Sequence, residues 1–142
     1  MKLAISTLLI LLMATMICSS VRATVTPQSL LQELRELVLN VDDRVFKGYV
    51  ITYTHQQKNA LARKIDATIG LYDLTEHEEA ADKLRDDIRP KLTNPWNDDG
   101  TPSKRARSWL RLYPEDCDEW RAVGSFAAQC QEIIESILTP NG

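Results

Sequence analysis

The chain has 142 residues, 44% of them hydrophobic and 26% charged, and its 17 basic and 20 acidic side chains give a net charge of −3 at pH 7. This length predicts one domain with a modest core. The acidic balance argues against nucleic acid as a partner.

The first 23 residues have the features of a secretory signal peptide. A basic start at Lys2 precedes an almost wholly apolar run from residue 3 to residue 18. Val21 and Ala23 are small enough for the two recognition positions of signal peptidase. The sequence therefore predicts a signal peptide at residues 1–23, a single domain at residues 24–142, and a secreted or extracytoplasmic location.

Two alternatives to this cleavage are weaker on physical grounds. A lipoprotein cut before Cys18 would place the bulky Met16 and Ile17 where that site requires small residues. An uncleaved membrane anchor would have an apolar run of about 16 residues, short of the roughly 20 that span a bilayer. Cleavage removes Lys2 and Arg22 but no acid, which leaves 15 basic against 20 acidic residues, a net charge of −5. We therefore predict no membrane insertion after cleavage.

Helix signals dominate the remaining chain. Thr26 followed by Pro27 is a typical helix start, and leucines and valines at helical spacing predict a helix over residues 27–41. Residues 42–53 contain Gly48 and several β-branched residues. This composition predicts a connector with up to one helical turn, and a short strand is the alternative.

The next two helices are predicted to fold back on each other. Capping boxes at residues 54–57 and 75–78 predict helices over residues 55–72 and 76–92. The turn between them is only a few residues long, so the two helices must form an antiparallel hairpin. Pro90 is expected to kink or end the second helix because proline has no backbone N–H.

The C-terminal third opens with a loop. Residues 93–103 contain two prolines, a glycine and several Asn and Asp residues, which is typical of a loop. A threonine–proline pair near its end predicts a short helix to about Leu112. A third capping box at residues 116–119 predicts a last helix that ends before Pro140.

Cys117 and Cys130 raise a conflict within this last helix. Apolar residues repeat at three- and four-residue steps from residue 120 to residue 137, which predicts an unbroken helix. Such a helix would hold the two Cα atoms roughly 20 Å apart, whereas a disulfide requires less than about 7 Å. A break at Gly124 would let the cysteines bridge, as an oxidising compartment favours. We favour the unbroken helix, with Cys130 buried and Cys117 free or intermolecular.

These elements predict an all-α fold, a small bundle of four or five helices around the antiparallel hairpin. The first and last helices are expected to cover the apolar faces of the hairpin. The predicted core consists of Leu34, Leu37, Leu61, Ile65, Ile69, Leu84, Ile88, Leu110, Trp120, Ala127, Cys130 and Ile134.

The hairpin has a characteristic set of residues between positions 59 and 88. It consists of Lys64-Ile65-Asp66-Ala67 in the first helix, and of Ala80, Ala81, Lys83, Leu84 and Ile88 in the second. In this pattern it resembles the FIVAR and FIMAH-type helical-hairpin modules attached to cell-surface proteins and secreted hydrolases of bacteria and archaea. Thr75 stands where those modules usually have a turn glycine, and His77 where they have an aromatic residue. The resemblance implies a non-catalytic extracellular module and carries over no functional residue.

Residue patterns that could hold a metal ion are incomplete. His55 and His77 would lie at opposite ends of the antiparallel hairpin. The turn at residues 97–100 looks like part of a calcium loop, but aligning its glycine with that of an EF-hand places Pro95 and Ala106 at ligand positions. We therefore predict no metal site and no cofactor, with a weak surface calcium site at this turn as the alternative.

The candidate binding patch combines basic residues with tryptophans. Its members are Trp96, Lys104, Arg105, Arg107, Trp109 and Arg111. On the helix predicted after residue 101, Lys104, Arg107 and Arg111 would share one face, which would suit an anionic glycan or an acidic partner. We favour the alternative in which Trp109 and Leu110 pack inward and the charged groups are solvated.

No nucleophile–base pair, glycine-rich phosphate loop or paired-carboxylate motif stands out, so we predict that the protein is not an enzyme. The predicted function is that of a secreted, non-catalytic interaction module that binds a protein or glycan at the cell surface. A small secreted effector or inhibitor of another protein is the alternative. An enzyme that uses surface carboxylates as acid and base is the third hypothesis. The identity of the ligand and the oligomeric state stay open.

Overall fold

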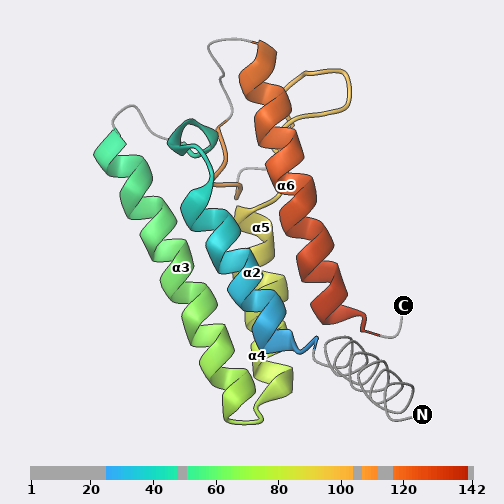
Figure 1. The fold of residues 1–142 in the computed structure, drawn as a ribbon. Coiled ribbons are helices and arrows are strands. Elements are labelled where there is room, and N and C mark those ends of the chain that lie inside the picture. The colour runs from blue at the N-terminus through green and yellow to red at the C-terminus, as the bar shows by residue number, and fades with distance from the viewer. Residues whose placement is uncertain (1–24, 48–50, 104–106, 112–116, 141–142) are drawn as a thin grey trace, which may run out of the picture.

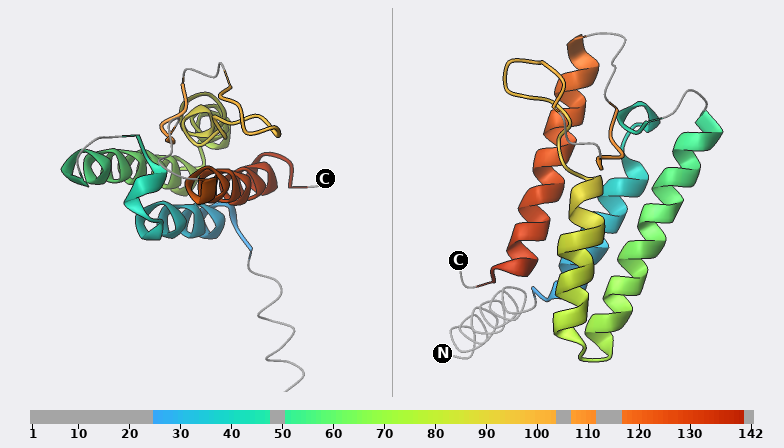
Figure 2. Two further views of the ribbon diagram at one scale, coloured as in Figure 1. Left: turned by 90° about the horizontal axis from the view of Figure 1, so that it is seen from above. Right: turned by 180° about the vertical axis from the view of Figure 1, so that it is seen from behind.

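The computed structural model describes residues 25–47, 51–103, 107–111 and 117–140. Helices α2 (Pro27–Asn40), α3 (Ile51–Asp73), a helical segment over residues 77–91 and α6 (Cys117–Leu138) run in alternating directions (Figure 1). Seen along the bundle, these four elements form a ring (Figure 2). The described chain is an all-α bundle, as predicted, whereas the predicted signal peptide lies outside the described residues. No described helix is both long enough and apolar enough to cross a bilayer.

Helix α2 begins where the sequence predicts. Thr26 is its N-cap: the Thr26 hydroxyl accepts a hydrogen bond from the Ser29 amide at 3.1 Å, and the Ser29 hydroxyl accepts one from the Thr26 amide at 3.0 Å. This reciprocal pair satisfies donors that the first helical turn leaves free. Leu31, Leu34 and Val38 lie on the inner face and are fully buried.

The connector after α2 contains one 3-10 turn, Asp43–Val45, so the expectation of a helical turn is confirmed. Helix α3 then begins at Ile51, earlier than predicted. Thr54 therefore lies inside the helix and is 3% exposed, so the capping box predicted at residues 54–57 is wrong. Burial of this side chain in the bundle outweighs the local capping signal.

The turn after α3 is a Schellman motif. The Glu76 amide donates to the Leu71 carbonyl at 2.9 Å, and the Thr75 amide donates to the Tyr72 carbonyl at 3.1 Å. Thr75 has a φ of 62°, in the left-handed region. The capping box predicted at residues 75–78 is therefore wrong: the N-cap of α4 (His77–Lys83) is Glu76, and no side chain caps that helix.

We expect Thr75→Gly to raise the free energy of unfolding by about 0.5–1 kcal/mol. The left-handed conformation costs a non-glycine residue about 1–2 kcal/mol, and glycine avoids this cost with a smaller entropic penalty in the unfolded chain. Thr75 is exposed, so the substitution loses little packing. Urea denaturation followed by circular dichroism would measure the gain. Glu76→Gly, at a neighbouring φ of −86°, is the control, and an equal gain there would contradict the explanation.

The second helix of the hairpin changes pitch before its proline. Helix α4 passes into a π-helical turn, Leu84–Ile88, and then into α5 (Arg89–Lys91). The Arg89 amide reaches back five residues to the Leu84 carbonyl. Pro90 follows directly, and its ring excludes the ordinary helical hydrogen bond. The predicted effect of Pro90 is confirmed, since the helix ends one residue later.

The loop over residues 93–103 folds back on itself, as its composition predicts. The Asn97 amide donates to the Thr101 carbonyl at 2.8 Å, and the Ser103 amide donates to the Pro95 carbonyl at 2.6 Å. These two bonds bring the ends of the loop together.

The helix predicted from Thr101 to Leu112 is wrong in its described part, residues 101–103 and 107–111. The Lys47 amide donates to the Trp109 carbonyl at 2.9 Å, and the Arg111 amide donates to the Val45 carbonyl at 2.7 Å. The segment is thus held extended by the connector after α2. This arrangement leaves the Leu110 side chain, between these two bonds, fully buried in the core. A pairing partner distant in sequence overrides the local helix signal.

Helix α6 runs without a break from Cys117 to Leu138, so the prediction of an unbroken helix is confirmed. Cys117 and Cys130 are roughly 20 Å apart along one helix, too far for a bridge between them. Gly124 does not end a helix but marks a close approach, because a Cβ there would lie 3.4 Å from Asn94 Nδ2. The capping residue predicted at Asp116 lies outside the described residues.

The core lies between the four helical elements. Nine of the twelve predicted core residues are buried, and Leu37, Ile69 and Trp120 are partly buried against the core. Two buried aromatic residues of the core were not among the predicted core residues. Phe46 from the connector and Phe126 from α6 meet edge to face, with ring centroids 5.8 Å apart. The connector therefore contributes a buried aromatic ring to the core beside α6.

Candidate functional site

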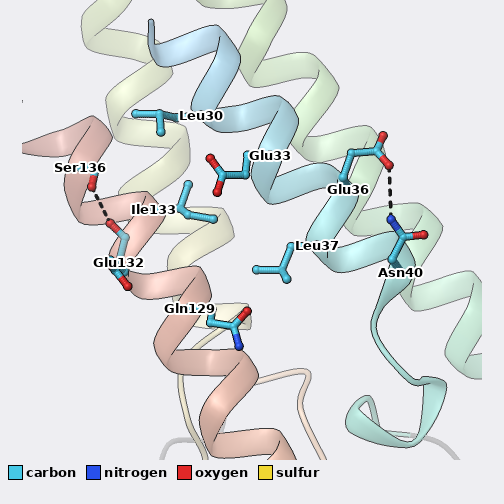
Figure 3. Close-up of a pocket in the computed structure, with 9 residues that line it drawn as sticks. All are labelled: Leu30, Glu33, Glu36, Leu37, Asn40, Gln129, Glu132, Ile133 and Ser136. Atoms are coloured by element: carbon cyan, nitrogen blue, oxygen red, sulfur yellow. Dashed lines mark hydrogen bonds between the residues drawn. The ribbon is translucent and has the colours of Figure 1, made fainter. Parts of the chain in front are cut away.

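A groove of about 530 Å³ lies between α2 and α6. Its apolar lining residues are Leu30, Leu37 and Ile133, each partly buried against the core. Its polar lining residues are Glu33, Glu36, Asn40, Gln129, Glu132 and Ser136. We call this surface the α2–α6 groove. The helices are antiparallel, so the start of α2 lies beside the end of α6 (Figure 3).

The carboxylates of the α2–α6 groove are only partly neutralised. Figure 3 shows the Glu33 carboxylate between the two helices, with Glu36 and Glu132 on opposite sides of it. Arg35 lies 3.7 Å from Glu36 and 2.8 Å from Asp66 of α3, so its guanidinium is directed away from α6. Within the described residues, Glu33 and Glu132 have no ion-pair partner. The groove therefore combines apolar side chains with negative charge that the described chain leaves unpaired.

The α2–α6 groove was not predicted from the sequence. The only signal was that leucines and glutamates alternate on the first helix and that an isoleucine adjoins a glutamate on the last. That pattern marks the edge of any amphipathic helix, so it has no functional meaning until the two helices are placed side by side.

The described members of the predicted basic patch, Trp96, Arg107, Trp109 and Arg111, differ in burial and in their contacts. Trp96 is 9% exposed and its indole N–H donates to the Arg111 carbonyl at 3.1 Å, so it is a packing residue. Arg107 is exposed, and Trp109 is partly buried against the core. The prediction that Lys104, Arg107 and Arg111 share one helical face is wrong, because the described part of this segment is not helical. Lys104 and Arg105 lie outside the described residues.

Arg107 and Trp109 do line a second hollow, of about 440 Å³. Its other lining residues are Lys47, Asp86, Asp87, Pro90, Lys91 and Ser108. We call it the Trp109 hollow. Lys91 Nζ lies 5.3 Å from the centre of the Trp109 ring. Asp87 accepts hydrogen bonds from Lys91 and from Lys64, the latter at 2.8 Å. The charge of Asp87 is therefore matched by two lysines, one of which, Lys91, also lines the hollow.

The pKa of Asp87 lies below its usual value. Partial burial would raise this pKa, but the hydrogen bonds and charges of Lys64 and Lys91 outweigh burial and lower it. A carboxyl group with a depressed folded-state pKa stabilises the protein above its unfolded-state pKa of about 3.9. That contribution is lost as the pH falls through the folded-state value.

We expect Asp87→Asn to lower the free energy of unfolding at pH 7 by about 1 kcal/mol and to flatten the loss of stability below about pH 4. Asp86→Asn is the matched control, because Asp86 is exposed and has no ion pair among the described residues. Urea denaturation across the acid range would measure both. If the free energy of unfolding fell as steeply with acid in Asp87→Asn as in the unmodified protein, the stabilising role of the Asp87 carboxylate would be contradicted.

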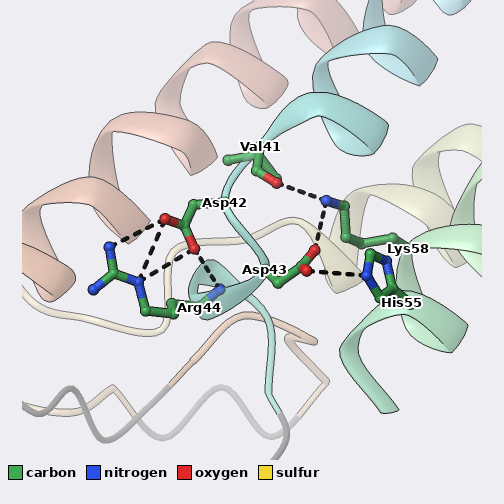
Figure 4. A network of polar contacts seen from close by, with 6 residues as sticks. All are labelled: Val41, Asp42, Asp43, Arg44, His55 and Lys58. Carbon is green, nitrogen blue, oxygen red and sulfur yellow. Dashed lines mark hydrogen bonds and ion pairs between the residues drawn. The ribbon is translucent and has the colours of Figure 1, made fainter. Parts of the chain in front are cut away.

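A third polar cluster joins the connector to α3 (Figure 4). Lys58 Nζ lies 2.9 Å from Asp43 Oδ1 and donates to the Val41 carbonyl at 2.6 Å. His55 Nε2 lies 3.2 Å from the second oxygen of Asp43. The arrangement therefore serves to anchor the 3-10 turn on α3.

The structure keeps the two histidines apart. His77 packs on Tyr72 near the end of α3, with ring centroids 5.3 Å apart, whereas His55 lies near the start of that helix. In the turn after Trp96, Asp99 accepts hydrogen bonds from the Thr101 amide at 3.0 Å and the Thr101 hydroxyl at 2.6 Å. No cluster of metal-binding side chains occurs among the residues that the structure describes.

Cys130 is a free cysteine and is fully buried in α6. Burial raises the pKa of its thiol to about 12, since the apolar core disfavours the thiolate. We expect Cys130 to resist iodoacetamide at about pH 8 in the folded protein and to react once guanidinium chloride unfolds the chain. Peptide mass spectrometry would identify the residue. Rapid alkylation of native Cys130 would contradict the buried position.

No family model matches the chain, and no curated protein or solved structure matches it. The fold and site thus define this chain as an all-α helical bundle with an acidic groove between its first and last described helices.

Proposed function

We propose that this protein is a secreted, non-catalytic interaction module that binds a partner at the cell surface through the α2–α6 groove. The observation that carries the proposal is the combination of partly exposed leucine and isoleucine side chains with two unpaired glutamates in one concave surface. Apolar surface bordered by polar groups is typical of protein-binding sites. The predicted signal peptide supports a location outside the cytoplasm.

The Trp109 hollow is the weaker candidate for the binding surface. It could present a tryptophan to a glycan, as the sequence analysis considered, and Lys47 and Arg107 lie at its edge. However, the lysines that contact Asp87 are already matched by it, and Trp109 is covered by Lys91. The groove offers both apolar contact and uncompensated charge, so we favour a protein partner over a glycan.

The resemblance to FIVAR and FIMAH-type hairpins supports the same class of function. Ala80, Leu84 and Ile88 of the shared pattern are fully buried, which is the role expected of packing positions. Thr75, at the usual glycine position of those modules, has the positive φ that glycine favours. These positions support a hairpin of that kind and leave the partner to be identified by experiment.

The experiment is affinity capture with the processed, tagged protein on envelope fractions and secreted proteins of the producing cell. We expect a reproducible envelope protein, retained by wild type and by the control Glu78→Lys/Glu79→Lys, which changes two exposed acids away from the groove. Failure to retain any envelope component would contradict the proposal. Release of the protein into the medium, with capture of a foreign enzyme or receptor, would instead favour the alternative of a secreted effector or inhibitor.

A further inference from the structure

The α2–α6 groove restricts the kind of partner segment that it can accept. Its walls are two helices, whose backbone amides and carbonyls are already hydrogen-bonded within each helix. An extended peptide would find no backbone partners in such a groove and would leave its own groups unsatisfied. A helix satisfies its own backbone groups and can present side chains alone. The groove therefore favours a helical occupant.

The apolar contacts set the spacing of the occupant. Leu30 and Leu37 are seven residues apart on α2, which corresponds to two helical turns or about 10 Å. Ile133 faces them from α6 (Figure 3). The lining of α2 extends to Asn40, so the groove is roughly 15 Å long and matches about ten residues of helix. Apolar side chains at positions i, i+3 or i+4, and i+7 of a partner helix would contact Leu30, Leu37 and Ile133 along this length.

The charges of the groove determine which charge the partner segment should carry. Glu33 lies between the helices and Glu132 on the α6 side, and neither has a cationic partner in the described chain. Glu36 shares Arg35 with Asp66, at a longer distance. Lysine or arginine beside the apolar stripe of a partner helix would compensate these carboxylates, and an acidic helix would be repelled.

Building on the proposed function, we propose that the α2–α6 groove binds a single basic amphipathic helix of a partner protein. The binding surface is the apolar floor of Leu30, Leu37 and Ile133 together with the carboxylates of Glu33 and Glu132. Apolar burial supplies most of the affinity, and the carboxylates supply the selectivity for a basic helix.

The test uses three synthetic peptides of about 14 residues with the processed protein. The first has leucines on one helical face and lysines beside them. The second has glutamates in place of the lysines, and the third has the first composition in an order that disperses the leucines. Fluorescence anisotropy would measure their binding. We expect a micromolar Kd for the first peptide, an affinity that falls as salt is added, and at least about tenfold weaker binding of the other two.

Groove variants locate the binding. We expect Glu33→Lys/Glu132→Lys to weaken binding of the lysine peptide about tenfold or more, and Glu78→Lys/Glu79→Lys to leave it within about twofold. Leu37→Asp should abolish detectable binding, and circular dichroism would establish that each variant is folded. Equal losses in the groove and control variants would overturn the proposal, because they would indicate attraction to the net charge of the whole chain.

The outcomes separate this inference from the proposed function. If an envelope partner is captured equally by wild type and by Glu33→Lys/Glu132→Lys, the module function stands and the groove assignment fails. If neither a peptide nor an envelope partner binds, both proposals fail. Sedimentation equilibrium showing a dimer that Leu37→Asp dissociates would also overturn the proposal, since a second copy of the chain would then occupy the groove.

Discussion

Replacing Phe46 with alanine is expected to lower the free energy of unfolding by about 4 kcal/mol. Phe46 is fully buried and its ring meets Phe126 of α6 edge to face at 5.8 Å. Truncation would leave a cavity where the connector, α6 and the segment around Leu110 meet. A loss of this size is a large part of the free energy of unfolding of a typical domain, which is about 5–15 kcal/mol. Urea denaturation monitored at the far-ultraviolet helix signal would measure it.

Two further variants make the Phe46 prediction specific. Tyr53→Ala removes an aromatic ring that is 56% exposed, and we expect a change within about 0.5 kcal/mol. A double-mutant cycle between Phe46 and Phe126 should give a coupling of about 0.5–1.5 kcal/mol, because edge-to-face rings interact beyond their buried area. A loss for Phe46→Ala no larger than that for Tyr53→Ala would show that the connector does not pack as described.

The second large effect is expected at Lys58, the buried cation of α3. Its side chain is 6% exposed and contacts both Asp43 and the Val41 carbonyl, at the end of α2. Lys58→Met keeps the length of the side chain but leaves the carboxylate and the carbonyl without this donor. We expect a loss of about 2–3 kcal/mol, near the lower end for a broken buried pair because the Asp43 side chain is 27% exposed.

The control for Lys58 is an exposed ion pair of the same chain. Arg85 lies 3.0 Å from Asp82 on the helix surface, with both side chains at least half exposed. Arg85→Met should cost less than about 1 kcal/mol. Adding Asp43→Asn to Lys58→Met should recover part of the loss, since no carboxylate is then left without its lysine partner. Strictly additive losses would indicate that Lys58 acts through the Val41 carbonyl alone.

Much of the bundle followed from local patterns in the sequence. The start of α2 at Pro27, the antiparallel hairpin and the unbroken α6 were all predicted. Each depends on a cap at the helix start, on apolar spacing within one helix or on the length of one turn, and these signals act over a few residues. The same spacing placed Leu84 and Ile134 in the core correctly.

Apart from the capping box at residues 75–78, where a local Schellman turn forms instead, the errors occurred where distant segments meet. Thr54 looked like a helix cap, but burial in the bundle places it inside α3. The segment before Arg111 looked helical, but backbone hydrogen bonds to the connector hold it extended. The helical face predicted for Lys104, Arg107 and Arg111 is therefore wrong, because the described part of this segment is not helical.

Helical periodicity was enough to predict an all-α bundle of four or five helices, because it is encoded in neighbouring residues, and the described chain has four main helical elements. The α2–α6 groove required the positions of two helices that are about 90 residues apart in the chain. Glu33 and Glu132 are ordinary surface residues on their own helices. They form a candidate binding site only because the bundle places them across one groove, where no described cation compensates their charge.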